Sequence, residues 1–253
     1  MPLKVILTGV IFGILAQTYT ATPEQAGRSH MSLIISVEQY DNVPDVVNAE
    51  RDAKAIARRL SELGYGVFHL RNPNRDELLR TLAAMRLASA EASQVVVYLA
   101  GHGFQNGATS YFLTRDVRLN TSSDEFSHGA IPLRMIIRAI SDKPRQKIVL
   151  FDACRTPPEL NIPSHPAPST TIAPAGLLLA YAAGAGQPAF DGVGSFSPFA
   201  TAFLRQMQTP DRPLIEILRN VRLDVVQQTG GRQVPWVQSS LLRPAILVPQ
   251  IRP

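Results

Sequence analysis

A single cysteine and one of the five histidines stand where a thiol nucleophile and its base would be needed. Cys154 follows the apolar run 147–153, and His102 follows the apolar run 94–101. Both runs are short, rich in β-branched and aromatic residues and stopped by turn-forming residues, which predicts buried parallel strands. Since function in open parallel sheets gathers at the carboxyl ends of strands, we expect both side chains at one edge. A thiol beside an imidazole predicts nucleophilic acyl transfer.

Glycines flank the histidine, in the sequence Gly101-His102-Gly103. A backbone without Cβ atoms allows close approach of a substrate. We therefore expect the amides of Gly103 and Cys154 to donate to the oxyanion that develops during acyl transfer. Alone, Cys154 would more often be a buried thiol and His102 a turn residue, and the hypothesis depends on the two occurring together.

The elements that must position these residues alternate between strands and helices. We expect strands at 32–37, 66–70, 94–102, 147–153, 176–182 and 245–248, helices near 47–63, 75–89, 133–140, 198–207 and 212–229, and a small hairpin at 109–114. Apolar residues recur at helical spacing in the helices. This alternation predicts an α/β fold with a mostly parallel sheet of about six strands, covered on both faces by about five helices.

The composition is that of one globular α/β domain. Of 253 residues, 45% are hydrophobic and 18% are charged, which argues against a disordered chain. No repeat with a period of 20–50 residues is present, which argues against a solenoid. The net charge of +5 comes from scattered arginines without a basic run interleaved with aromatics, so we expect no nucleic-acid partner.

The N-terminal segment resembles a secretory signal peptide. A short positive start is followed by the uncharged apolar stretch 5–16 and by small polar residues. We expect residues 1–21 to be a signal peptide, giving a periplasmic or secreted protein without a membrane span after processing. The alternative is an uncleaved N-terminal anchor in the membrane. A lone cysteine in an oxidising compartment favours a reactive thiol over a structural disulfide.

Three motifs resemble those of the caspase-like peptidases of bacteria and of their metacaspase relatives: residues 98–103, 150–155 and 48–53. The histidine also lies about 50 residues before the cysteine, as in caspases. Residues 197–199 and 230–236 are similar to the C-terminal part of secreted bacterial members. The resemblance covers 31–250 and implies one caspase-like peptidase domain there, a three-layer α/β/α sandwich with a proline-rich loop at 157–174. It implies a cysteine endopeptidase with a peptide or protein substrate.

The chain departs from the family pattern at three positions. Asp152 stands where caspases have glutamine, Thr156 stands where many bacterial relatives have aspartate, and Ala100 replaces a family serine two residues before the histidine. None of these changes alters the nucleophile or the base.

The resemblance to metacaspases implies cleavage after arginine or lysine, with acidic residues in the specificity pocket. The matching positions are Asp52 and Asp152, and a carboxylate can bind a guanidinium through two hydrogen bonds. Asp52 could instead stabilise a helix N-terminus, and Asp152 could make a structural hydrogen bond at the strand end. Trp236 could wall a neighbouring subsite or lie in the core.

Other functions stay open. The fold could be a catalytically silent binding or signalling module, or a cysteine hydrolase of a non-peptide amide. We expect no metal and no cofactor, because the other histidines are not spaced as ligands with Cys154. Some metacaspases depend on calcium, but no calcium loop is recognisable. No residue that would orient His102 is identifiable, and the oligomeric state is not predicted.

Overall fold

The computed structural model describes residues 29–118, 128–140, 142–154, 174–192 and 194–248. The expected signal peptide (1–21) and all but the last residue of the expected proline-rich loop (157–174) lie outside these ranges. No helix in the described part of the chain is long and apolar enough to cross a membrane.

A six-stranded sheet forms the middle of the molecule, with the strand order β2-β1-β3-β7-β8-β9. Its strands are β1 (His30–Ser36), β2 (Gly66–Arg71), β3 (Gln94–Gly101), β7 (Gln146–Ala153), β8 (Leu177–Tyr181) and β9 (Trp236–Ser239). The first five pair in parallel and only β9 is antiparallel. The prediction of a mostly parallel sheet is confirmed.

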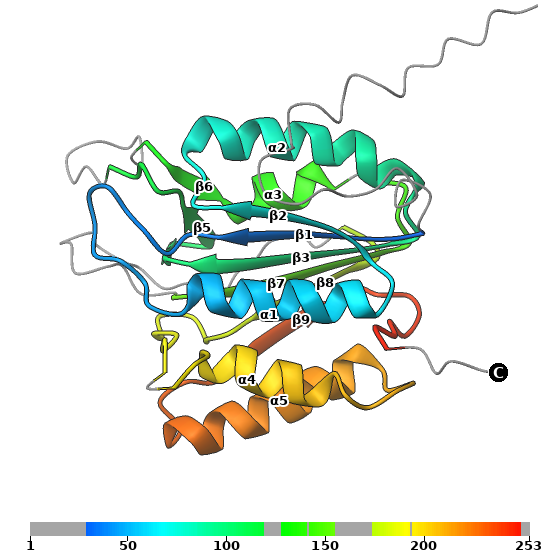
Figure 1. Ribbon diagram of the computed structural model, residues 1–253. Coiled ribbons are helices and arrows are strands. Elements are labelled where there is room, and N and C mark those ends of the chain that lie inside the picture. The colour runs from blue at the N-terminus through cyan, green and yellow to red at the C-terminus, as the bar shows by residue number, and fades with distance from the viewer. Residues whose placement is uncertain (1–28, 119–127, 141, 155–173, 193, 249–253) are drawn as a thin grey trace, which may run out of the picture.

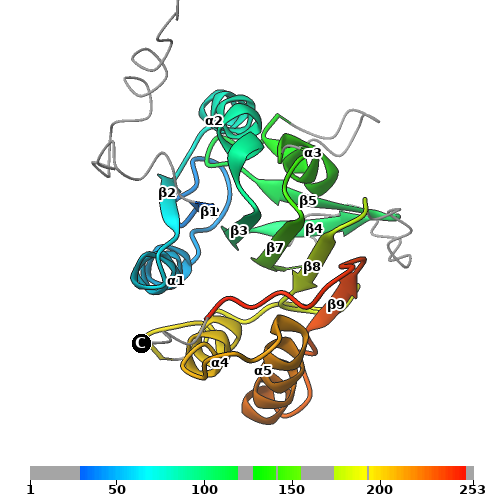
Figure 2. The ribbon, with the colours of Figure 1, turned by 90° about the vertical axis from the view of Figure 1, so that its right-hand side faces the viewer.

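Five α-helices cover the two faces of this sheet, as expected. They are α1 (Ala49–Glu62), α2 (Arg75–Ala88), α3 (Leu133–Ala139), α4 (Pro198–Gln206) and α5 (Leu214–Thr229). Figures 1 and 2 show α2 and α3 on one face and α1, α4 and α5 on the other, so the molecule is a three-layer α/β/α sandwich.

A second, three-stranded antiparallel sheet lies beside the carboxyl ends of β1 and β3 (Figure 1). It is made of β4 (Gly103–Asn106), β5 (Thr109–Leu113) and β6 (Ala130–Pro132). The hairpin expected at 109–114 is wrong in its bounds, because residues 109–113 form the single strand β5, which pairs with the preceding β4. The amide of Leu113 donates to the carbonyl of His102 at 3.0 Å, which joins this sheet to the end of β3.

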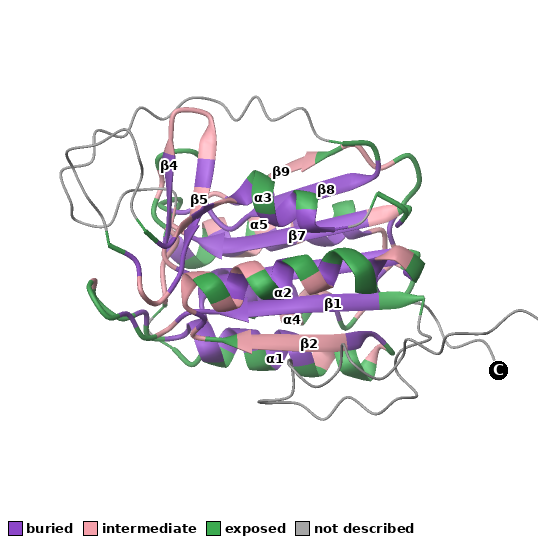
Figure 3. Ribbon diagram, turned by 90° about the horizontal axis from the view of Figure 1, so that it is seen from above, coloured by how far each residue is buried: buried purple, intermediate pink, exposed green. Residues whose placement is uncertain are grey.

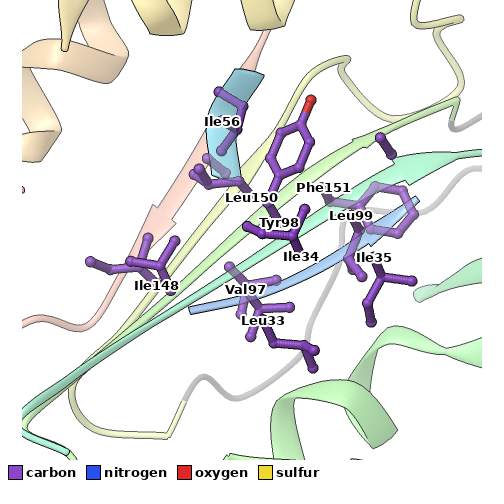
Figure 4. Close-up of a cluster of buried hydrophobic side chains, with 14 of the residues drawn as sticks. Leu33, Ile34, Ile35, Ile56, Val97, Tyr98, Leu99, Ile148, Leu150 and Phe151 are labelled. Carbon is purple, nitrogen blue, oxygen red and sulfur yellow. The ribbon is translucent and has the colours of Figure 1, made fainter. Parts of the chain in front are cut away.

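The core lies on both sides of the central strands. Figure 3 shows β1 and β7 almost entirely buried, whereas β2 at one edge is only half-buried. Figure 4 shows the aliphatic side chains of β1, β3 and β7 packed together with Tyr98 and Phe151. Burying such side chains contributes roughly 1.5–3 kcal/mol each, so this layer holds the carboxyl ends of the strands in fixed positions.

The expected last strand is wrong. Residues 245–248 form only an isolated bridge, between Ile246 and Pro213, and the sixth strand is β9. The amides of Leu214 and Asp211 donate to the carbonyls of Ala245 and Val248, at 2.7 and 2.8 Å. This segment is thus paired with the chain that leads into α5 instead of the sheet, although its apolar pattern is that of a strand.

Candidate active site

The ends of β3 and β7 bring His102 and Cys154 to the same place. The two strands are parallel neighbours, and Gly101 of β3 is the register partner of Ala153 of β7. Each functional residue is the next residue along its strand. Adjacent strands lie about 4.8 Å apart, so the two backbones leave the sheet side by side. This is the arrangement that the two apolar runs predict.

The imidazole of His102 is oriented by a backbone carbonyl. Its Nε2 lies 2.7 Å from the carbonyl oxygen of Pro44, and because a carbonyl only accepts, Nε2 must carry a proton. In the neutral ring this assigns the free electron pair to Nδ1, the nitrogen left to act as the base. No pattern along the chain indicates this partner, since Pro44 is 58 positions away in a loop.

Tyr40 holds the backbone of the histidine. The amide of His102 donates to the Tyr40 hydroxyl at 2.7 Å, and the two rings pack with centroids 4.8 Å apart. Burial raises the pKa of Tyr40 far above its ordinary value, so the hydroxyl stays neutral. The sequence analysis did not identify Tyr40.

Two glycines allow the close packing around the histidine. Gly101 has a φ of +149°, and a Cβ there would lie 2.8 Å from both the Tyr40 hydroxyl and the Val37 carbonyl. A Cβ at Gly103 would lie 2.8 Å from the Phe151 ring and 3.0 Å from the Cys154 carbonyl oxygen. The backbones of Gly103 and Cys154 therefore lie close together.

The thiol of Cys154 is half-buried and contacts the loop between β8 and α4. Its Sγ donates to the carbonyl of Ala189 at 3.2 Å. This loop, residues 182–197, therefore passes directly beside the sulfur atom. It is the segment that a substrate next to Cys154 would meet.

Asp52 and Asp152, here called the acid pair, are brought together by Ser197. The amide of Ser197 donates to both carboxylate oxygens of Asp52, at 3.1 and 3.2 Å, and its hydroxyl donates to Asp152 at 3.0 Å. The hydroxyl of Tyr98 donates to the same oxygen of Asp152 at 2.7 Å. Both aspartates are buried. In the sequence Ser197 was only the first residue of the 197–199 motif; in the structure it is also the N-cap of α4, accepting from the amide of Ala200.

The acid pair is electrostatically unfavourable as it stands. Among the described residues, neither Asp52 nor Asp152 forms an ion pair with a lysine, arginine or histidine. Burial, and then repulsion from Asp152, raise the pKa of Asp52, and burial likewise raises the pKa of Asp152. Two buried carboxyls without a cation favour a shared proton or a positively charged ligand.

A third carboxylate, Asp191, lies close to the acid pair and adds to the repulsion on both members. Its Oδ2 accepts from the amide of Val47 at 3.4 Å, at the start of α1. It also lines a cavity of about 610 Å³ together with Phe190 and Arg232, whose guanidinium lies 5.0 Å from the centre of the Phe190 ring. The sequence analysis did not identify Asp191, because nothing local to residues 182–197 indicates a contact with α1.

The remaining sequence candidates have a simple outcome. Trp236 begins β9 and is 53% exposed, so its placement in the core is wrong, while a role beside a subsite is untested. No group of three or more metal-ligating side chains is found among the described residues. The site thus contains a thiol, an oriented imidazole and a buried pair of aspartates.

Comparisons with known proteins agree with this architecture. The family model described as the caspase domain matches residues 29–246. The chain is similar to the crystal structure of caspase-1 from Spodoptera frugiperda, with a TM-score of 0.65 and 15% sequence identity, over 89% of this chain and 92% of that chain. At this identity the likeness shows the fold alone. A search of curated proteins found no match.

Proposed function

The chain belongs to the caspase domain family, and from this premise we propose that it is a cysteine endopeptidase that cleaves after arginine or lysine. Cys154 is the proposed nucleophile and His102 the proposed base. The observation that carries the proposal is the pairing of Gly101 with Ala153, which delivers both residues to one edge of the sheet.

The proposed reaction is acyl transfer in two steps. His102 takes the proton of the Cys154 thiol as the sulfur attacks the carbonyl carbon of the substrate, and it passes this proton to the leaving amine as the C–N bond breaks. Water, deprotonated by His102, then releases the acyl group from the sulfur. The Nε2 contact with Pro44 supports this role, because it holds the ring in one orientation and leaves Nδ1 to carry the proton.

The backbone amides of Gly103 and Cys154 are the proposed donors to the oxyanion. The closeness of the two residues supports this assignment, since the carbonyl oxygen of Cys154 lies 3.0 Å from the place that a Gly103 Cβ would occupy. Preorganised amides stabilise the negative charge only as it develops, and losing one such donor typically costs about 100- to 1000-fold in rate. No metal or cofactor enters the proposed reaction.

The acid pair is proposed to bind the basic side chain of the substrate residue before the cleaved bond. Asp52 and Asp152 are buried and lack a cationic partner among the described residues, while Ser197 and Tyr98 hold their oxygens in place. A guanidinium or ammonium group would replace the missing charge. Burial, and after it repulsion from neighbouring carboxylates, raises both pKa values, and a positively charged ligand would offset both effects.

Fluorogenic peptides ending in arginine, lysine or aspartate test the proposal, with Cys154→Ala as the control. We expect turnover after arginine or lysine that is lost in Cys154→Ala. Turnover after aspartate would keep the peptidase and contradict the role of the acid pair. No turnover on any peptide, with calcium or with a chelator, together with no labelling of Cys154 by a thiol probe, would favour a catalytically silent binding module.

We also propose that the protein is exported and processed near residue 21. The apolar stretch 5–16 after a positive start supports this location. N-terminal sequencing of the protein from its native host tests it, because an intact Met1 in a membrane fraction would instead indicate an anchor.

A further inference from the structure

We propose that Asn48 is a specificity-determining residue that selects arginine over lysine before the cleaved bond, by accepting a guanidinium N–H on its Oδ1. This inference rests on the proposed function and narrows its substrate class. The side chain of Asn48 has no role in the proposed acyl transfer.

The amide of Asn48 is held in one orientation. Its Nδ2 donates to the carbonyl of Asp191 at 2.6 Å and lies 3.3 Å from the carbonyl of Gly194. Since both partners are acceptors, this end of the amide must be the NH₂ group. The Oδ1 atom is consequently turned away from the loop. It is buried, in a residue only 1% exposed, and has no hydrogen-bond partner among the described residues.

A second asparagine shows that this acceptor is not used for the helix. Asn48 and Asn74 both precede helices of 14 residues, α1 and α2. Asn74 caps its helix, with its Oδ1 accepting from the amide of Glu77 at 2.9 Å. Asn48 makes no side-chain cap. A buried acceptor without a donor is destabilising, so an unused one at this position points to a ligand that supplies the donor.

Asn48, which carries the unused acceptor, lies close to Asp52 of the acid pair. Asn48 and Asp52 are one turn apart on α1, where side chains four positions apart share a face. The loop before α4 contacts both of them, through the carbonyls of Asp191 and Gly194 on Asn48 and through the amide of Ser197 on Asp52. The carboxylate of Asp191 lies against the amide of Val47, the residue before Asn48.

This arrangement suits a guanidinium better than an ammonium. A guanidinium has five N–H donors in one plane, and a carboxylate fork satisfies two of them. The remaining donors need acceptors beside the fork, and Asn48 Oδ1 is an acceptor already desolvated and fixed in direction. An ammonium group has three donors on a compact centre and does not need this additional oxygen. Asn48 therefore adds binding for arginine that lysine does not receive.

The test compares kcat/KM on two peptides that differ only in arginine or lysine before the cleaved bond. We expect the wild type to prefer arginine, and Asn48→Ala to lower the arginine-to-lysine ratio about tenfold or more, through slower cleavage after arginine. Asn74→Ala is the matched control: it removes an asparagine before a helix of the same length and should leave the ratio unchanged.

The outcomes separate this inference from the proposed function. If Asn48→Ala slows cleavage after arginine and lysine equally, Asn48 only anchors the loop and the inference is wrong. Equal rates on the two peptides in the wild type would also overturn it, while the basic specificity of the acid pair would stand. Cleavage after neither residue would overturn both.

Discussion

Two buried carboxylates on α1, only two positions apart, have opposite surroundings. Glu50 is surrounded by partners: Arg71 Nε at 2.5 Å, Lys54 Nζ at 3.3 Å and the Ser36 hydroxyl at 2.6 Å. Asp52 has hydrogen bonds from Ser197 and faces a second carboxyl, Asp152. Both residues sit at the same helix end, where the helix dipole favours negative charge equally. The helix dipole therefore does not explain why the two carboxylates have different surroundings.

The contrast separates a structural carboxylate from one that awaits a ligand. The negative charge of Glu50 is paired with two cations of the fold, so this carboxylate needs no further partner. The acid pair carries two negative charges, or one and a proton, without a cation among the described residues. A positively charged group bound beside the two carboxyls would relieve this repulsion. We assign that role to the substrate side chain.

Removal of the charge on Asp52 gives the largest expected effect. We expect Asp52→Asn to lower kcat/KM on an arginine peptide about 100-fold, because a charged hydrogen-bonded pair to the substrate contributes about 2–4 kcal/mol. The melting temperature of the ligand-free protein should rise, since the repulsion with Asp152 is removed. Peptide kinetics together with thermal denaturation measure both. A lower melting temperature with unchanged cleavage would reverse the assignment.

Glu50→Gln is the matched substitution on the structural side, and its effect should have the opposite sign. We expect the free energy of unfolding to fall by about 1–3 kcal/mol, because Arg71 and Lys54 lose their carboxylate while Ser36 keeps an acceptor. The arginine-to-lysine ratio should not change. Denaturant unfolding measures the stability, and a Glu50→Gln protein that loses basic specificity would show that the two clusters are not separate.

The stability contributed by the acid pair and the stability contributed by the groups around Glu50 should depend on pH in opposite directions. The pKa of Asp52 is raised to about 8 and that of Asp152 to about 6, above their value of 3.8 in the unfolded chain. Between pH 4 and pH 8 the native pair thus binds more protons than the unfolded pair, so its contribution to stability falls as the pH rises. Burial lowers the pKa of His69, beside Glu50, so the folded protein favours the neutral imidazole. The contribution of His69 to stability is therefore lost as the pH falls below 6.5.

Asp52→Asn isolates the first of these contributions. We expect the melting temperature of the wild type to fall more than that of Asp52→Asn between pH 5 and pH 8, with about 2–4 °C for each kcal/mol in a protein of this size. Parallel slopes for the two proteins would mean that the acid pair does not bind the additional proton.

Lys54→Ala should have the smallest effect and shows which cation balances Glu50. Lys54 is 60% exposed and four residues from Glu50 on the helix, so its ion pair contributes about 0.3–0.5 kcal/mol. We expect an equally small loss of stability, abolished at high salt. A loss above about 1 kcal/mol by denaturant unfolding would mean that Lys54, and not Arg71, is the main partner of Glu50.

The parts of this protein that were predictable from the sequence are those set by local patterns. Apolar runs that end at His102 and Cys154 predicted the two strands, and helical spacing predicted the five helices. The segment 245–248 failed because its pattern cannot tell pairing with the sheet from pairing with the chain before α5.

The site was only partly predictable, because its contacts join distant residues. Asp52 and Asp152 came from a resemblance to metacaspases. Ser197, which links them, is 145 positions from Asp52, and Pro44 is 58 positions from His102. Asn48 was seen only as part of a motif, since an unsatisfied amide oxygen is a property of the packed structure and has no pattern along the chain.

The most direct test of the central claim compares arginine with citrulline before the cleaved bond, in otherwise identical peptides, on the wild-type protein. Citrulline has nearly the shape of arginine without its charge, so the comparison isolates the interaction with the acid pair. We predict a kcat/KM at least about 100-fold higher for arginine, as expected for a charge bound between buried carboxylates. Equal rates on the two peptides would contradict the claim that Asp52 and Asp152 receive a cation.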